Sequence, residues 1–215
     1  MKIYLFKSQK DLYINFEKDT NMIIVTGISG SGKSRTSLAL QKKYNYELLS
    51  FDFIFDWEFE RKPSSFEKEI LKEFKKKYPE FRNSKNNTKS KIEVCNCFYD
   101  FIADYILSKN IKIIIDGAYF LNEINFEKIK NERIILKRTS IIKSIIQRTN
   151  RNKKHIIAQN YSLFKTYRRI FGMYGESIKK SIIWKKLINN FIEKIQINEG
   201  NKINILEREE SIIFD

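Results

Sequence analysis

Residues 27–34 read Gly27-Ile28-Ser29-Gly30-Ser31-Gly32-Lys33-Ser34, which is the complete pattern G-x-x-x-x-G-K-[ST]. Three of the seven glycines in the 215-residue chain fall within it. An apolar, β-branched run at 22–25 precedes the loop, and helix-forming residues at 35–43 follow it. Strand, glycine loop and helix form the arrangement in which backbone N–H groups and a helix N-terminus converge on phosphate oxygens. The pattern therefore predicts a loop that binds a nucleoside triphosphate.

Each residue type in this loop meets a physical requirement of phosphate binding. Glycine allows backbone conformations and a close approach that a Cβ would block. Lys33 supplies a positive charge for the β- and γ-phosphates of ATP, and the Ser34 hydroxyl can ligate Mg²⁺. A bare glycine turn that binds nothing would need neither of these residues. We therefore expect ATP to contact residues 27–34 and the residue that follows, Arg35.

The composition favours a folded, reduced protein. Hydrophobic residues make up 42% of the chain and aromatic residues 14%, which argues against disorder. No apolar stretch approaches the length of a membrane-spanning helix. Cys95 and Cys97 are the only cysteines, and this single pair supports neither a disulfide framework nor a zinc site. We therefore expect a cytoplasmic protein with no membrane partner.

The net charge of +15 has two explanations that the sequence leaves open. It arises from 41 Lys and Arg residues against 26 Asp and Glu residues. Such a charge raises the local concentration of anionic ligands, which fits a nucleotide or nucleic-acid partner. The chain is also rich in Lys, Asn and Ile, as expected from an AT-rich coding sequence, and this bias alone would produce a basic protein.

Alternating apolar runs and amphipathic stretches predict the order of the elements. The expected strands are 2–6, 12–16, 22–25, 46–51, 111–115, 133–136 and 202–206, with the first two forming a hairpin. The expected helices are 35–43, 66–78, 92–108, 140–149, 155–171 and 176–194. Buried strands that alternate with helices imply a parallel sheet covered on both faces. Together with the phosphate-loop pattern, this predicts an α/β fold, a three-layer P-loop NTPase.

The domain organisation follows from the absence of repeats and linkers in the sequence. We expect a single domain over residues 1–215, with its core at about 20–152 and a helical, lid-like part at about 153–215.

Two aspartates end predicted strands, and each has a candidate role. Asp116 follows the apolar run 111–115 as in a Walker B element, beside the phosphate loop, where it can hold Mg²⁺. A strand-end Asp-Gly turn is the alternative. Asp52 ends the strand 46–51 on the acceptor side and can accept the proton of an attacking hydroxyl. Asp56 is the reserve candidate for that role, and a solvated acid or helix cap is the alternative for Asp52.

Two arginines follow the strand 133–136 and the helix after it. Arg148 or Arg151, placed near the transferring phosphoryl group, would stabilise its spread negative charge when a lid closes. In so basic a chain, a solvated basic helix end is the competing explanation. His155, the only histidine, has no acidic partner in the sequence, and we expect it to be an ordinary polar residue.

The chain resembles the P-loop kinase group that includes polynucleotide 5′-kinases, zeta-toxin-like kinases and related small phosphotransferases. The resemblance covers about residues 22–152 and rests on residues 27–34, 48–52, 113–117, 134–136, 148 and 151. It implies a nucleotide-kinase-like fold whose parallel sheet carries a helical lid or insertion. It also implies that Asp52 contacts the acceptor hydroxyl and that Arg148 or Arg151 belongs to a lid over ATP. Adenylate-kinase-like enzymes place Pro-Arg soon after the Asp-Gly of the third strand. This chain has Ala118-Tyr119-Phe120 there, which weakens a nucleoside-monophosphate kinase interpretation.

These residues favour an ATP-dependent kinase. It would transfer the γ-phosphate of ATP, with Mg²⁺, to a hydroxyl or phosphate of a nucleotide, a nucleic-acid end or another small acceptor. The candidate catalytic residues are Lys33, Asp52, Arg148 and Arg151, and the candidate metal ligands are Ser34 and Asp116. A P-loop ATPase that remodels nucleic acid or protein is the alternative, and a nucleotide-binding regulator without turnover is a third. Transporter-type and repair ATPases carry a Ser-Gly-Gly signature and a Glu after the Walker B Asp, whereas Gly117 follows Asp116 here.

Overall fold

The computed structural model describes most of the chain, in several ranges. These are residues 4–6, 21–55, 62–81, 91–129, 132–140, 142–143, 145–147, 149–150, 163–197 and 203–207.

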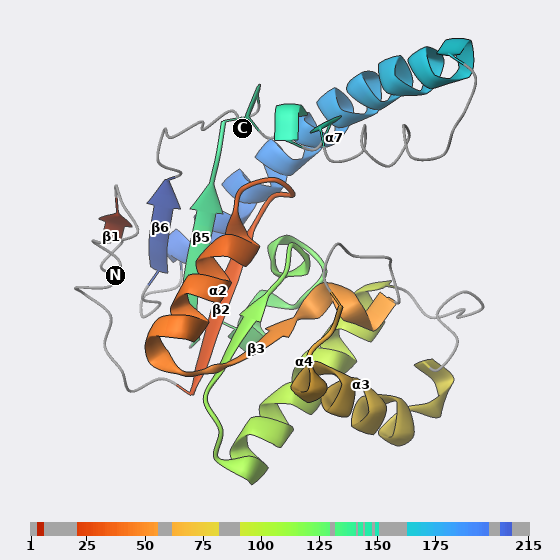
Figure 1. Cartoon of the computed structure of the whole chain (residues 1–215). Helices are drawn as coiled ribbons and strands as arrows, with labels where there is room; N and C mark the ends of the chain where they lie inside the picture. Colours follow the sequence, from red (N-terminus) through yellow and green to blue (C-terminus); the bar gives the residue numbers. More distant parts are fainter. Residues whose placement is uncertain are drawn as a thin grey trace.

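A six-stranded sheet forms the centre of the molecule, and all of its strand pairs are parallel (Figure 1). Its strands are β1 (Tyr4–Phe6), β2 (Met22–Gly27), β3 (Glu47–Ser50), β4 (Ile113–Asp116), β5 (Arg133–Arg138) and β6 (Ile203–Glu207). Their order across the sheet is β1-β6-β5-β2-β4-β3. The strand that leads into the glycine loop, β2, therefore lies between β5 and β4. The carboxyl ends of β2, β4 and β3 meet at one edge of the sheet.

Helices connect these strands. The longer ones are α2 (Lys33–Tyr44), α3 (Ser65–Lys77), α4 (Lys91–Lys109) and α7 (Leu163–Ile197), with a single turn at α5 (Phe126–Ile129). Short 3₁₀ segments are η1 (Phe51–Phe55), η2 (Pro79–Phe81) and η4 (Tyr119–Leu121). The segment η1 directly follows β3, and η4 begins three residues after the end of β4, so both lie at the same edge as the glycine loop.

The strands are apolar on both faces, and alternate residues enter two separate cores. Ile24 and Ile115 pack into the larger core, which contains residues of α3, α4, α5 and α7. Their neighbours Ile23 and Ile114 pack into the smaller core, which contains Leu40 of α2. Continuous β-branched runs are what a parallel sheet covered on both faces requires. The predicted three-layer α/β fold with a parallel sheet is therefore confirmed.

The N-terminal strand is in the predicted place and pairs with a strand from the other end of the sequence. The sequence predicts a hairpin of residues 2–6 and 12–16, whereas β1 pairs in parallel with β6, placing Leu5 opposite Ile205. Residues 12–16 lie outside the described part of the chain. The pairing joins segments from opposite ends of the sequence, which local turn signals do not predict.

The prediction of two separate helices over 155–171 and 176–194 is wrong. A single 35-residue helix, α7, runs from Leu163 to Ile197 and passes through Gly172 and Gly175. Its C-terminal half packs under the sheet through Ile188 and Phe191, and its N-terminal half extends beyond the sheet (Figure 1). Within the described ranges, no helix combines the length and apolar character that crossing a membrane requires.

We expect alanine at Gly172 or Gly175 to stabilise the protein. A Cβ at either position would meet no heavy atom within 4 Å, so neither glycine is required by packing. Glycine inside a helix costs about 1 kcal/mol relative to alanine, and each substitution should raise the free energy of unfolding by about 0.5–1 kcal/mol. Urea denaturation of Gly172→Ala, Gly175→Ala and the double variant checks this. Unchanged midpoints in all three would show that the helix is not continuous here.

Candidate active site

The loop between β2 and α2 has the backbone conformation that its glycines permit. Gly27, Gly30 and Gly32 have φ angles of +151°, +82° and +84°, a region that L side chains rarely adopt. A Cβ on Gly27 would lie 2.4 Å from the carbonyl oxygen of Lys137 and 2.8 Å from Ser31 Oγ. A hydrogen bond from the Ser31 N–H to the Ile28 carbonyl oxygen, 3.1 Å long, closes a turn within the loop. Position 27 is therefore a glycine because there is no room for a Cβ atom.

The end of the loop presents the N-terminus of α2. Gly32 is the N-cap, and it has no side chain to accept from the N–H groups of the first turn. Lys33 begins the helix and is only 9% exposed, whereas Ser34 and Arg35 are exposed. Ser31 Oγ is fully buried and has no hydrogen-bond partner among the described residues. An anion-binding helix end, a buried hydroxyl and a lysine at one loop fit a phosphate chain.

Asp116 lies next to this loop. It is the last residue of β4, 3% exposed, and is paired with Val25 of β2 on one side and Ser50 of β3 on the other. The N–H of Gly117 donates to the Val25 carbonyl oxygen at 3.2 Å, and Thr26 Oγ1 donates to the Gly117 carbonyl oxygen at 2.8 Å. These bonds tie the turn after Asp116 to the residues that lead into the glycine loop.

Asp116 and Ser34 are the residues that fit a magnesium ion. A buried carboxylate and an exposed hydroxyl are hard oxygen donors, which Mg²⁺ prefers. Two protein ligands suffice because Mg²⁺ in nucleotide sites takes its remaining ligands from phosphate and water.

Asp52 lies at the same edge, two residues beyond the strand neighbour of Asp116. It belongs to η1, and its side chain is half-buried. The preceding residue, Phe51, anchors η1: its ring packs against Phe98 and Phe120, each with ring centroids 5.0 Å apart. A fully buried aromatic residue therefore fixes the backbone that carries the Asp52 carboxylate.

A second anchor for this backbone is Glu67, which the sequence reasoning missed. Its side chain is fully buried, and Oε1 accepts from the Ser50 N–H at 2.8 Å. Oε2 accepts from the Ser64 N–H at 2.9 Å, and the Ser64 hydroxyl accepts from the Glu67 N–H, which completes a capping box. The spacing Ser64-x-x-Glu67 was the available signal. One carboxylate therefore joins the start of α3 to the end of β3.

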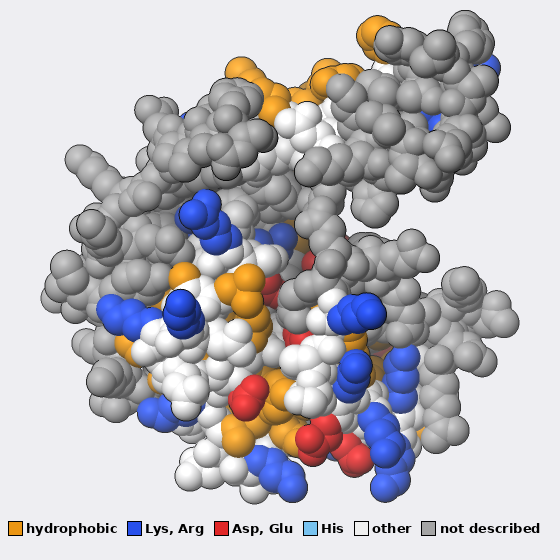
Figure 2. Space-filling view, in the orientation of Figure 1, with side chains coloured by type: hydrophobic (Ala, Val, Ile, Leu, Met, Phe, Trp, Pro, Cys, Tyr) orange, Lys and Arg blue, Asp and Glu red, His pale blue; other side chains and the backbone are white. Residues whose placement is uncertain are grey.

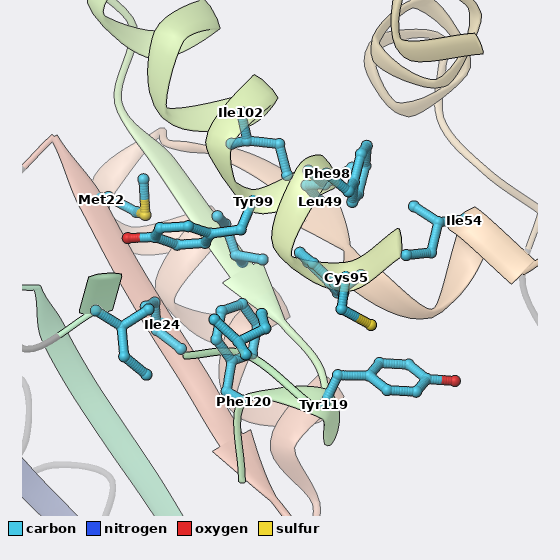
Figure 3. Close-up of a cluster of buried hydrophobic side chains, with 14 of the residues drawn as sticks. Met22, Ile24, Leu49, Ile54, Cys95, Phe98, Tyr99, Ile102, Tyr119 and Phe120 are labelled. Atoms are coloured by element: carbon cyan, nitrogen blue, oxygen red, sulfur yellow. The ribbon is translucent and has the colours of Figure 1, made fainter. Parts of the chain in front are cut away.

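The aromatic cluster beside Asp52 ends at Tyr119, the first residue of η4. Figure 3 shows the Cys95 side chain directed toward Tyr119, whose hydroxyl points away from Phe120 and Ile24. Burial raises the pKa of the Tyr119 phenol, and the charge of Asp52 raises it further. Burial also raises the pKa of the Cys95 thiol, so both groups are neutral at physiological pH. The wall beside Asp52 is therefore neutral and aromatic.

The structure brings some of the predicted site residues together, and others lie outside its described part. The loop 27–34, Arg35, Asp116 and Asp52 gather at the carboxyl edge of the sheet. Arg148, Arg151, Asp56 and His155 lie outside the described residues. Their roles remain predictions.

Lys137 is a second residue that the sequence reasoning missed. It is a buried residue near the carboxyl end of β5, and its strand partner is Gly27. A lysine inside an otherwise apolar strand, RIILKR at 133–138, was the available signal. Its carbonyl oxygen and Cβ lie beside the first glycine of the loop.

Comparisons with known proteins give distant structural likeness only. No family model matches the chain, and no curated protein matches it. Shikimate kinase from Acinetobacter baumannii, solved with shikimate, is 14% identical, with 87% of this chain and 98% of that chain covered and a TM-score of 0.36. TT1252 from Thermus thermophilus is 14% identical over 88% and 89%, with a TM-score of 0.39. Deoxyadenosine kinase from M. mycoides, with bound dATP, is 16% identical over 86% and 90%, with a TM-score of 0.36. Likeness of this degree carries no argument about the activity of this chain.

Proposed function

We propose that this chain is an ATP-dependent phosphotransferase that moves the γ-phosphate of ATP to a hydroxyl of a small acceptor. The observation that carries the proposal is the placement of two carboxylates at the loop edge of the sheet. Asp116 pairs with β2 directly before the glycine loop, and Asp52 lies two residues past the β3 partner of Asp116. One acid thus lies on the nucleotide side and the other on the acceptor side.

Each residue has a role that its position supports. The glycine loop and the N-terminus of α2 bind the phosphates, and Lys33 neutralises the β- and γ-phosphate oxygens. Ser34 and Asp116 would hold Mg²⁺, which would supply positive charge to neutralise the phosphates of ATP. Asp52 accepts the proton of the attacking acceptor hydroxyl. Arg148 and Arg151 belong to this proposal as lid residues that stabilise charge on the transferring group.

A small acceptor is favoured over a nucleic-acid end by the mixed charge on the first turns of α3, before Lys75, Lys76 and Lys77 in its last turn. Figure 2 shows Lys and Arg side chains over α3, with acidic side chains among them. Along α3 the exposed Lys68 and Lys72 alternate with Glu69 and Glu73, a pattern typical of a solvated helix surface. A phosphate-backbone track would instead require an uninterrupted basic stripe.

The experiment compares the wild-type chain with Asp52→Asn and measures the rate of phosphate transfer from ATP to an added acceptor. With γ-labelled ATP, Mg²⁺ and a pool of hydroxyl compounds, the wild-type chain should label an acceptor, and Asp52→Asn should lower the transfer rate by roughly 100- to 10,000-fold. Because Asp52 acts on the acceptor, ATP affinity should remain within about twofold. The matched control is Asp104→Asn, since Asp104 is an exposed carboxylate of α4 that pairs with Lys77 at 3.5 Å. Label released only as inorganic phosphate, at the same rate in Asp52→Asn, would support the remodelling ATPase instead.

A further inference from the structure

A lysine stands against the aromatic wall beside Asp52. Lys91 Nζ lies 4.4 Å from the ring centroid of Tyr119 and 5.6 Å from that of Phe55. The two rings are themselves 5.1 Å apart, and Phe55 belongs to the same short helix as Asp52. Lys91 comes from α4, so three segments distant in sequence converge here. The ammonium group is therefore held close to the acceptor side of the site.

One charged neighbour of this lysine is the carboxylate of Glu123. Glu123 Oε1 lies 3.9 Å from Lys91 Nζ, which is longer than a hydrogen bond. Burial raises the pKa of Glu123, Lys91 lowers it and the charge of Asp52 raises it. Lys91 therefore shares one electrostatic neighbourhood with two carboxylates, and its side chain retains 44% of its exposure.

The backbone around this cluster is well anchored. Asn96 Nδ2 donates to the Glu123 carbonyl oxygen at 2.9 Å, and Asn96 Oδ1 accepts from the Asn125 N–H at 2.9 Å. The Glu123 N–H donates to the Tyr119 carbonyl oxygen at 2.8 Å. These bonds fix α4 against the segment after β4. The position of Lys91 relative to Tyr119 is thus built by the fold.

We propose that Lys91 binds an anionic group of the acceptor, so that the acceptor is a small hydroxyl compound that carries a carboxylate or a phosphate. The inference rests on the proposed phosphotransferase function. The Lys91 ammonium lies over the Tyr119 ring, and the charge of Asp52 acts on that same tyrosine, so the N–H donors of Lys91 lie near the proposed acceptor side. A carboxylate or phosphate meets those donors with charge-assisted hydrogen bonds. Glu123 holds the lysine in place and competes with the ligand for it.

The competing explanation is that Lys91 only balances the charges of Asp52 and Glu123. In that case Lys91→Met would lower the activity toward every acceptor alike. Under the proposal, the loss is confined to anionic acceptors and appears in KM, because the contact is made in the ground state as well as in the transition state. Measuring KM and kcat of the wild-type chain and of Lys91→Met, on an anionic acceptor and its neutral counterpart, therefore separates the two explanations.

The experiment uses glycerate against glycerol and a nucleoside 3′-monophosphate against its nucleoside, with the full chain, ATP and Mg²⁺. We expect the wild-type chain to phosphorylate one anionic member at least tenfold better than its neutral counterpart, about the worth of one charged hydrogen bond. Lys91→Met should raise KM for that member by roughly 10- to 100-fold and leave ATP affinity unchanged. Lys91→Arg should restore part of the loss. Glu123→Gln should lower KM a few fold because it removes the competing charge.

Lys77→Met is the matched control. Lys77 Nζ lies 5.6 Å and 5.7 Å from the ring centroids of Tyr78 and Phe101 and 3.5 Å from Asp104, so its local chemistry is the same. It stands at the C-terminal end of α3, away from the glycine loop, and its replacement should leave KM unchanged.

The outcomes separate this inference from the proposed function. Equal rates on anionic and neutral members, or a Lys91→Met effect shared by both, would overturn the inference and leave the phosphotransferase intact. Phosphorylation of a 5′-hydroxyl oligonucleotide that Lys91→Met does not affect would also overturn it. Absence of transfer to every member of the panel, with ATP hydrolysed to phosphate, would overturn the proposed function itself. The acceptor whose KM rises in Lys91→Met, glycerate or the 3′-monophosphate, shows whether Lys91 binds a carboxylate or a phosphate. Either result supports the inference.

Discussion

Replacing Gly27 with alanine is expected to lower the free energy of unfolding by about 3–5 kcal/mol, a larger loss of stability than for any other substitution proposed for this protein. Two costs combine at this position. The φ angle of +151° is strained for any L side chain, and the new Cβ would lie 2.4 Å from the backbone oxygen of Lys137. A backbone oxygen in the sheet cannot rotate away, so β2 and β5 would have to separate.

The matched control is Gly32→Ala, which isolates the conformational cost. Gly32 has a φ of +84°, but a Cβ there would meet no heavy atom within 4 Å. We expect this variant to lose only about 1–2 kcal/mol. Denaturant titration of both proteins, with circular dichroism as the probe, measures the difference. Equal losses for the two variants would mean that the contact between Gly27 and Lys137 is not as tight as the structure shows.

Replacing Lys33 with methionine is expected to reduce phosphate transfer from ATP by roughly 100- to 1000-fold. Methionine keeps an apolar stem of similar length in a position that is only 9% exposed. It removes the positive charge that the proposed function assigns to the phosphates of ATP. Because that role places the charge where negative charge would develop, the loss should appear mainly in kcat, with ATP affinity falling as well.

The control for Lys33 is Lys42→Met on the same helix. Lys42 is exposed in the last turn of α2, and its replacement removes the same charge from the opposite end. Initial-rate kinetics and thermal melts of both variants are the measurements. A Lys33→Met protein that melts like the wild-type chain and still transfers phosphate at the wild-type rate would refute the role assigned to Lys33.

The central part of the fold could be predicted from the sequence because its signals are local. The runs around Ile24, Ile114 and Ile135 are apolar on both faces, and only a buried parallel strand requires that. The glycine loop and the acid at the end of β4 follow from motif spacing. Strand neighbours then place Asp116 and Asp52 at one edge, as expected.

The remainder depends on contacts that the sequence does not encode locally. The continuity of α7 through Gly172 and Gly175 reflects a helix long enough to absorb two unfavourable residues. The pairing of β1 with β6 joins the two ends of the chain. Lys91 and Tyr119 are separated by all of α4 and β4, so only the fold reveals their contact.

The proposed function requires that the γ-phosphate of ATP reaches an acceptor and not water. The most direct measurement is phosphorus NMR of a mixture of the full chain, ATP, Mg²⁺ and a pool of hydroxyl compounds. We expect a phosphomonoester signal that grows in step with ADP, inorganic phosphate that stays low, and loss of the phosphomonoester signal in Asp52→Asn. Inorganic phosphate that grows in step with ADP, with no phosphomonoester at any acceptor concentration, would show that the chain hydrolyses ATP and does not transfer its phosphate.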